Sequence, residues 1–121
     1  MPVSARARQR CRAFLPPAAR IDCLFPAIRM PSSWARMELG AALVVATDTE
    51  ILVLGCSAAS HDQPLAVSGR CPRSTRLGPV TDPVPTITLG RLVLRIEQEY
   101  VPVVRAADSE TELPPDPLPD L

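Results

Sequence analysis

Two residue types are missing from this sequence, and aromatic residues are scarce. Lysine and asparagine are absent, so all 13 cations are arginines, and they balance 13 acidic residues. With two Phe, one Trp and one Tyr, the chain has few side chains on which nucleic-acid bases could stack, so we do not expect a nucleic-acid partner. GC-rich codons favour arginine, alanine and proline. One interpretation of the composition is therefore nucleotide bias acting on a weakly constrained reading frame.

Motifs that would identify a cofactor or a reaction are also missing. The chain contains no C-x-x-C pair, G-x-G-x-x-G loop, Walker loop or H-E-x-x-H helix. No motif indicates a family. We therefore expect a protein that is not an enzyme, without catalytic, cofactor-binding or metal-binding residues.

One segment is an alternative to that expectation. Cys56, His61, Asp62 and Cys71 lie close enough in the sequence to supply ligands to one metal ion. The same segment offers Cys56 or Ser57 as a nucleophile with His61 as its base. A disulfide between Cys56 and Cys71 would need an oxidising compartment, and free thiols are the favoured state. The alternative function is thus a small metal-binding or hydrolytic protein.

Charge divides the chain into three segments. Residues 1–36 hold seven arginines and a single acid, residues 37–105 are mixed, and residues 106–121 hold five acids and no arginine. The last segment also contains four prolines, so it can neither form a regular backbone ladder nor bury much apolar surface. We expect an acidic, proline-rich, disordered tail there.

The basic segment 1–36 has several interpretations. Arg6, Arg8, Arg10 and Arg12 would flank an apolar helical stripe, and Arg-rich, acid-poor amphipathic segments are typical of mitochondrial transit peptides. The favoured alternative is a disordered leader, or translation that starts at Met30 or Met37. Contact with phosphates or anionic lipids is a third interpretation. No apolar run typical of a secretory signal follows the arginines, so a cytoplasmic protein is favoured and a secreted one is not expected.

Regular structure is expected in residues 32–63, the longest stretch without proline. The pattern predicts a short helix over 33–39, strands over 43–46 and 51–54, and a turn over 47–49. Both strands are apolar on both faces, which requires a cover on each side. Asp48 and Glu50 would lie in the middle of the apolar run, so we do not expect a transmembrane segment.

The rest of the segment 37–105 is less regular in its pattern. Five prolines in residues 57–86 predict a loop. Residues 88–101 fit both templates, but alternation of Leu92, Leu94 and Ile96 with polar residues favours a strand over a helix. Pro102 would confine this strand to an edge of the sheet.

Together these patterns predict a mostly irregular chain with a small β-rich (α+β) core that contains a hairpin. A core of this size buries a limited fraction of its surface, so we expect a partner protein or self-association to complete it. The function that fits best is that of a small, non-enzymatic accessory or interaction protein.

Overall fold

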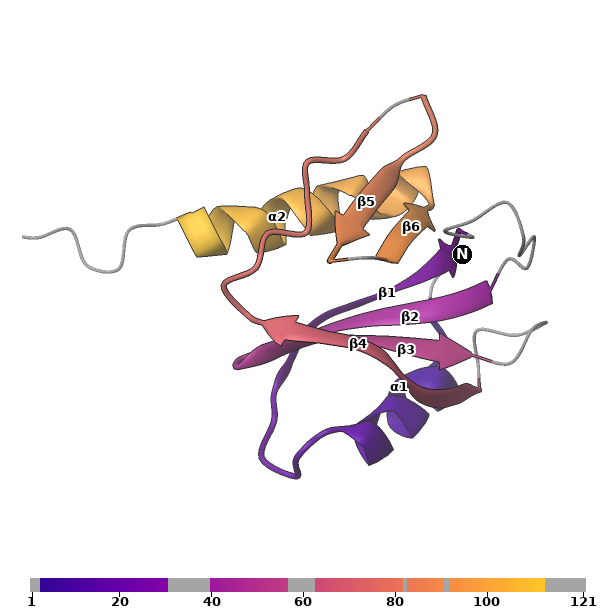
Figure 1. The fold of residues 1–121 in the computed structure, drawn as a ribbon. Helices are drawn as coiled ribbons and strands as arrows, with labels where there is room; N and C mark the ends of the chain where they lie inside the picture. The colour runs from indigo at the N-terminus through magenta and orange to yellow at the C-terminus, as the bar shows by residue number, and fades with distance from the viewer. Residues whose placement is uncertain (1–2, 31–39, 57–62, 82, 91, 113–121) are drawn as a thin grey trace, which may run out of the picture.

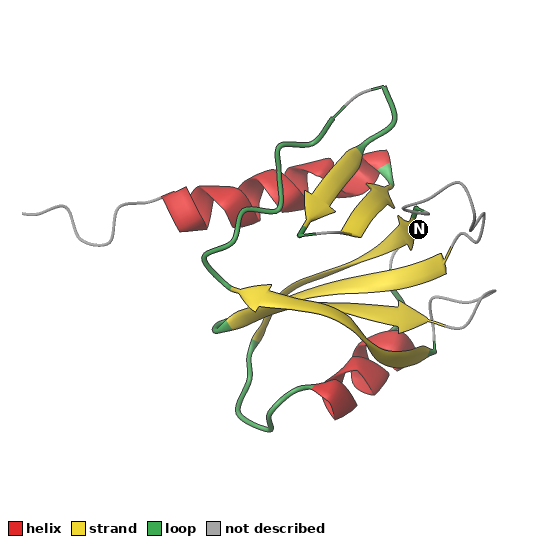
Figure 2. Ribbon diagram, in the orientation of Figure 1, coloured by secondary structure: helices red, strands yellow, loops and turns green. Residues whose placement is uncertain are grey.

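The computed structural model of the chain describes residues 3–30, 40–56, 63–81, 83–90 and 92–112. The elements in these residues, in chain order, are α1 (Ala5–Cys11), the 3-10 turn η1 (Arg12–Phe14), β1 (Ile21–Arg29), β2 (Gly40–Thr47), β3 (Glu50–Cys56), β4 (Pro64–Pro72), β5 (Thr86–Leu89), β6 (Leu92–Ile96), the 3-10 turn η2 (Gln98–Tyr100) and α2 (Val101–Glu112). Strands predominate (Figure 2). The predicted β-rich core is confirmed, whereas the prediction of a mostly irregular chain is wrong.

The strands of the described residues form one antiparallel sheet in the order β4-β3-β2-β1-β6-β5. The sheet curls, so that β4 at one edge meets the β5–β6 turn near the other (Figure 1). Leu92 packs so closely on Gly69 that a Cβ added at residue 69 would lie 2.8 Å from Leu92 Cδ1. A side chain at position 69 would therefore require Leu92 to shift.

The hairpin β2–β3 lies in the middle of this sheet and is buried on both faces, as its sequence predicts. One face packs against α2 in a cluster that includes Val44, Ala46, Ile51 and Val53 of the hairpin and Val101, Val104 and Ala107 of α2. The other face packs against α1 in a cluster that includes Leu43, Val45, Leu52 and Leu54 of the hairpin and Ala7 and Cys11 of α1. We call these the α2 cluster and the α1 cluster, and the two sides of the sheet its α2 face and its α1 face. Each helix supplies one of the two covers.

The turn of this hairpin is confirmed, but its stabilising residue is Thr47. The buried Thr47 Oγ1 accepts hydrogen bonds from the N–H groups of Thr49 (3.2 Å) and Glu50 (3.0 Å). Asp48, the acidic residue of the turn, accepts from the Arg20 N–H through Oδ1 at 3.1 Å. The turn is therefore joined to the chain just before β1.

The prediction of a disordered N-terminal leader is wrong for the described residues 3–30. Ser4 Oγ caps α1 by accepting from the Ala7 N–H at 3.1 Å, and α1 then buries Ala7 and Cys11. β1 lies between β2 and β6, so a strand within the predicted leader is central to the sheet. The predicted helix over 33–39 falls outside the described residues.

The predicted loop over 57–86 is only partly a loop. β4 pairs with β3 from Glu50 to Cys56, and prolines 64 and 72 stand at its two ends, where β4 is an edge strand. Prolines are compatible with those positions because an edge strand has one side on which its N–H groups need no partner strand. The loop prediction treated each proline as the end of regular structure, and it therefore missed this strand.

The C-terminal part combines a confirmed and a wrong prediction. Residues 92–96 form a strand with Leu94 and Ile96 buried and Arg95 exposed, as the alternation predicts, and Gly90 supplies the positive φ of 60° in the β5–β6 turn. The strand is not confined to an edge, because β6 pairs with both β1 and β5, and Pro102 lies instead at the start of α2. Pro102 is compatible with a first helical turn because its missing N–H would have no partner within the helix there. α2 continues to Glu112, beyond the predicted start of the tail at 106; residues 113–121 fall outside the described part.

Candidate functional site

The predicted Cys/His site does not come together. Cys71 pairs with Ile51 at one end of the β3–β4 ladder, whereas Cys56 pairs with Pro64 at the other end. Five residues of strand separate the two positions, a distance of about 16 Å. Two cysteines bound to one zinc ion or joined in a disulfide must lie much closer, so Cys56 and Cys71 do neither. All four cysteines are free thiols.

The other members of that site, His61 and Asp62, fall outside the described residues. Among the residues that are described, no group of three or more His, Cys, Asp or Glu is placed to hold a metal ion. Cys71 instead lines a cavity of about 250 Å³ where β4 meets the β5–β6 turn, together with Arg70, Gly69 and Leu92. Arg70 Nε there forms an ion pair with Glu50 Oε1 at 3.0 Å.

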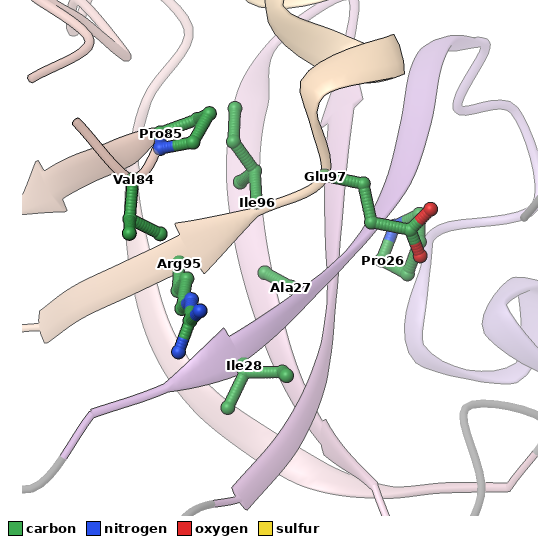
Figure 3. A pocket seen from close by; sticks show the side chains of 8 residues that line it. All are labelled: Pro26, Ala27, Ile28, Val84, Pro85, Arg95, Ile96 and Glu97. Atoms are coloured by element: carbon green, nitrogen blue, oxygen red, sulfur yellow. The ribbon is translucent and has the colours of Figure 1, made fainter. Parts of the chain in front are cut away.

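A larger cavity, of about 430 Å³, lies between β1, β6 and the loop before β5 (Figure 3). We call it the β1–β6 groove; it is lined by Pro26, Ala27, Ile28, Val84, Pro85, Arg95, Ile96 and Glu97. Its volume falls in the range of sites that bind small molecules or short peptide segments. Its lining is mainly apolar, with one cation and one carboxylate.

Proline at position 26 explains why the groove opens there. The Met30 N–H donates to the Val93 carbonyl at 2.9 Å, and Ile28 lies opposite Arg95 in the ladder. In an antiparallel pair every second residue of β1 directs its N–H at β6. After residues 30 and 28, the next such N–H would belong to residue 26, and proline has none. The ladder between β1 and β6 ends at Ala27, and beyond it the strands are free to separate.

The opposite wall of the groove comes from residues 84 and 85. The Ile96 N–H donates to the Pro85 carbonyl at 2.9 Å, which fixes this segment beside β6. Val84 and Ile28 remain 39% and 37% exposed, which places them among the most exposed large apolar side chains of the described residues. Two exposed apolar side chains at one groove indicate a surface that gains stability when another molecule covers it.

The charged residues mark the two ends of the groove. Figure 3 shows Arg95 on the side of Ile28 and Val84, and the Glu97 carboxylate beside Pro26. β6 ends at Ile96, and Glu97 follows it in an extended conformation, so Arg95 and Glu97 point to the same side and are separated by about 7 Å along the chain. An occupant would thus meet a cation at one end, apolar side chains in the middle and a carboxylate at the other end.

Sequence reasoning did not identify this groove. Arg95 is an exposed polar residue of the alternating strand, as the pattern predicts, whereas Glu97 follows the end of β6, and Val84 and Pro85 lie within the predicted loop. The proline in an otherwise apolar, strand-like stretch, IDCLFPAIR, was the one available signal, since it marks a missing ladder donor. Nothing in the sequence indicates that this strand pairs with β6.

Comparison with known proteins does not add a function to this geometry. No protein-family model matches the sequence, and no curated protein or solved structure is significantly similar to it. None of the helices in the described part of the chain is long and apolar enough to cross a membrane.

Proposed function

We propose that this chain is a small interaction protein that binds a short apolar segment of a partner protein in the β1–β6 groove. The observation that carries the proposal is the exposure of Ile28 and Val84 at a groove of about 430 Å³. Covering such side chains removes apolar surface from water, which is the main favourable contribution to most protein associations. A volume of about 430 Å³ fits a short peptide segment better than a broad protein surface.

The charges of the groove specify the chemistry of the partner segment. Arg95 favours an acidic side chain at the Ile28 end, and Glu97 disfavours one at the other end. Electrostatic complementarity of this kind selects the partner and the direction in which it binds. The segment we propose therefore carries one or two apolar residues that follow or precede an acidic residue.

Selection of peptides from a random library displayed on phage, followed by NMR titration, tests this proposal. We expect selected peptides to be apolar with an acidic residue and to shift the amide signals of Ala27, Ile28 and Ile96. Val84→Asp should weaken their binding tenfold or more, because it adds a charge to the apolar wall. Leu65→Asp is the matched control: it changes an exposed apolar residue outside the groove and should leave affinity unchanged.

Two results would contradict the proposal. One is selected peptides that bind Val84→Asp as tightly as the unchanged protein, or that shift signals remote from the groove. The other is a dimer in sedimentation velocity that Val84→Asp dissociates, since the groove would then belong to a second copy of this chain. Both variants need to retain the dispersed amide spectrum of the unchanged protein for the comparison to be made.

A further inference from the structure

A second surface of the molecule, formed by α1 and the start of β4, combines positive charge with exposed apolar side chains. Ala7 and Cys11 hold α1 against the sheet, so the arginines between and beside them are directed away from it. Arg6, Arg8 and Arg12 are exposed and Arg10 is half-buried. The fold thus fixes three cations, Arg6, Arg8 and Arg10, on one short helix on the α1 face, whereas Arg12 follows in η1 and donates to the Ala19 carbonyl.

The charge of Arg6 and Arg8 is not offset by an acid on the same helix. Residues 1–21 contain no Asp or Glu, and Asp22 is engaged by Arg20 at 3.0 Å and by Arg73 at 3.8 Å. Within the described part of the chain, Arg6 and Arg8 form no ion pair. The positive potential of these arginines attracts a negatively charged surface.

Apolar side chains are exposed beside these cations. α1 contacts β4, and Figure 1 shows the helix next to the start of that strand. Leu65 is 65% exposed, and Val67, which pairs with Leu54 and so lies on the α1 face, is 39% exposed. Cations next to exposed aliphatic residues are the combination by which peripheral proteins contact the headgroups and acyl chains of a bilayer.

We propose that α1 and the start of β4 form a contact surface for anionic phospholipid bilayers. The phosphates of nucleic acid would attract the same arginines, but they offer no apolar phase for Leu65 and Val67. Base stacking is also not favoured, since Phe14, the aromatic residue that follows these arginines in the sequence, is half-buried against the α1 cluster. The apolar side chains therefore favour a lipid surface over a nucleic acid.

Sedimentation of the full-length protein with phosphatidylcholine vesicles, with and without phosphatidylserine, tests this inference. We expect binding to the vesicles that contain phosphatidylserine to be at least tenfold stronger and to decrease as salt is raised. Arg6→Glu with Arg8→Glu should abolish that preference. Arg29→Glu with Arg105→Glu, two exposed arginines outside this surface, makes the same change in net charge and should retain it.

Leu65→Ser tests the apolar contribution separately. It leaves the charge unchanged and should reduce binding to the phosphatidylserine vesicles severalfold. The inference is overturned by equal binding to both vesicle types, or by equal losses in the two double-arginine variants. Duplex DNA that binds in an Arg6- and Arg8-dependent manner while vesicles do not would assign the surface to nucleic acid and also overturn it. Because the β1–β6 groove is unchanged in the Arg6, Arg8 and Leu65 variants, this outcome is independent of peptide binding.

Discussion

Cys11 is a single residue that makes the stability of the folded protein depend on pH. It is fully buried between α1 and the sheet, in contact with the α1 cluster. Burial raises the pKa of the Cys11 thiol from its ordinary value of 9.0 to about 11, and the Arg8 guanidinium opposes this rise more weakly. The thiol therefore behaves as a small apolar side chain at neutral pH.

The raised pKa of Cys11 predicts a loss of stability in alkaline solution. In the unfolded chain the thiol ionises near pH 9, whereas in the folded chain it stays protonated until about pH 11. Its contribution is thus complete below pH 9 and is lost as pH rises through this range. A difference of two units between the pKa values of Cys11 in the folded and unfolded chain corresponds to roughly 2–3 kcal/mol of unfolding free energy.

Denaturant unfolding of the unchanged protein and of Cys11→Ala at increasing pH measures this contribution. We expect the difference in unfolding free energy between the two to shrink between pH 9 and pH 11. Burial and, to a smaller extent, Glu99 and Glu97 raise the pKa of Tyr100 above its ordinary value. Its effect is common to both proteins and cancels. A difference that stays constant over this range would contradict the prediction.

At the scale of elements, α2 fixes the connection between β4 and β5. Asp108, on α2, accepts hydrogen bonds from the N–H groups of Leu77 at 2.7 Å and of Gly78 at 2.8 Å. Leu77 is fully buried in the α2 cluster, so its backbone needs a partner inside the protein. The carboxylate thereby gives a segment without regular structure a defined place.

Asp108→Ala should therefore destabilise the protein more than an alanine substitution at an exposed position of α2. The variant leaves two N–H groups without their acceptor, which costs roughly 2–3 kcal/mol of unfolding free energy. Hydrogen exchange at the amides of Leu77 and Gly78 should accelerate accordingly. The neighbouring variant Ser109→Ala removes an exposed hydroxyl that donates to the Arg105 carbonyl, and we expect a change below about 0.5 kcal/mol. Equal effects of the two variants would show that Asp108 does not fix the connection.

The elements also show which parts of the fold were predictable. The β2–β3 hairpin was found because its pattern is local: two apolar strands surround a polar turn, and both faces needed a cover. β1 and β4 were missed because prolines and arginines obscure a strand whose pairing is decided by distant partners. The groove was missed for the same reason. Exposure of Ile28 and Val84 follows from how β1, β6 and residues 84–85 pack, which no local pattern encodes.

At the scale of the whole molecule, the position of β1 bears on where the functional chain can begin. β1 supplies the strand between β2 and β6, and its Leu24 and Phe25 are buried in the α1 and α2 clusters respectively. A chain that starts at Met30 or Met37, or from which residues 1–36 are removed as a transit peptide, lacks this strand. The sheet would be divided, and both clusters would lose apolar contacts.

Two truncations separate the contribution of α1 from that of β1. A chain that starts at Pro16 loses α1, which exposes Leu43 and Leu52 but leaves the sheet continuous, so we expect a folded protein with a lower unfolding midpoint. A chain that starts at Met37 loses the central strand as well, and its amide spectrum should collapse. NMR spectra and thermal unfolding of both proteins check this order. A dispersed spectrum from the Met37 chain would show that β1 is dispensable and would restore the interpretation of residues 1–36 as a removable leader.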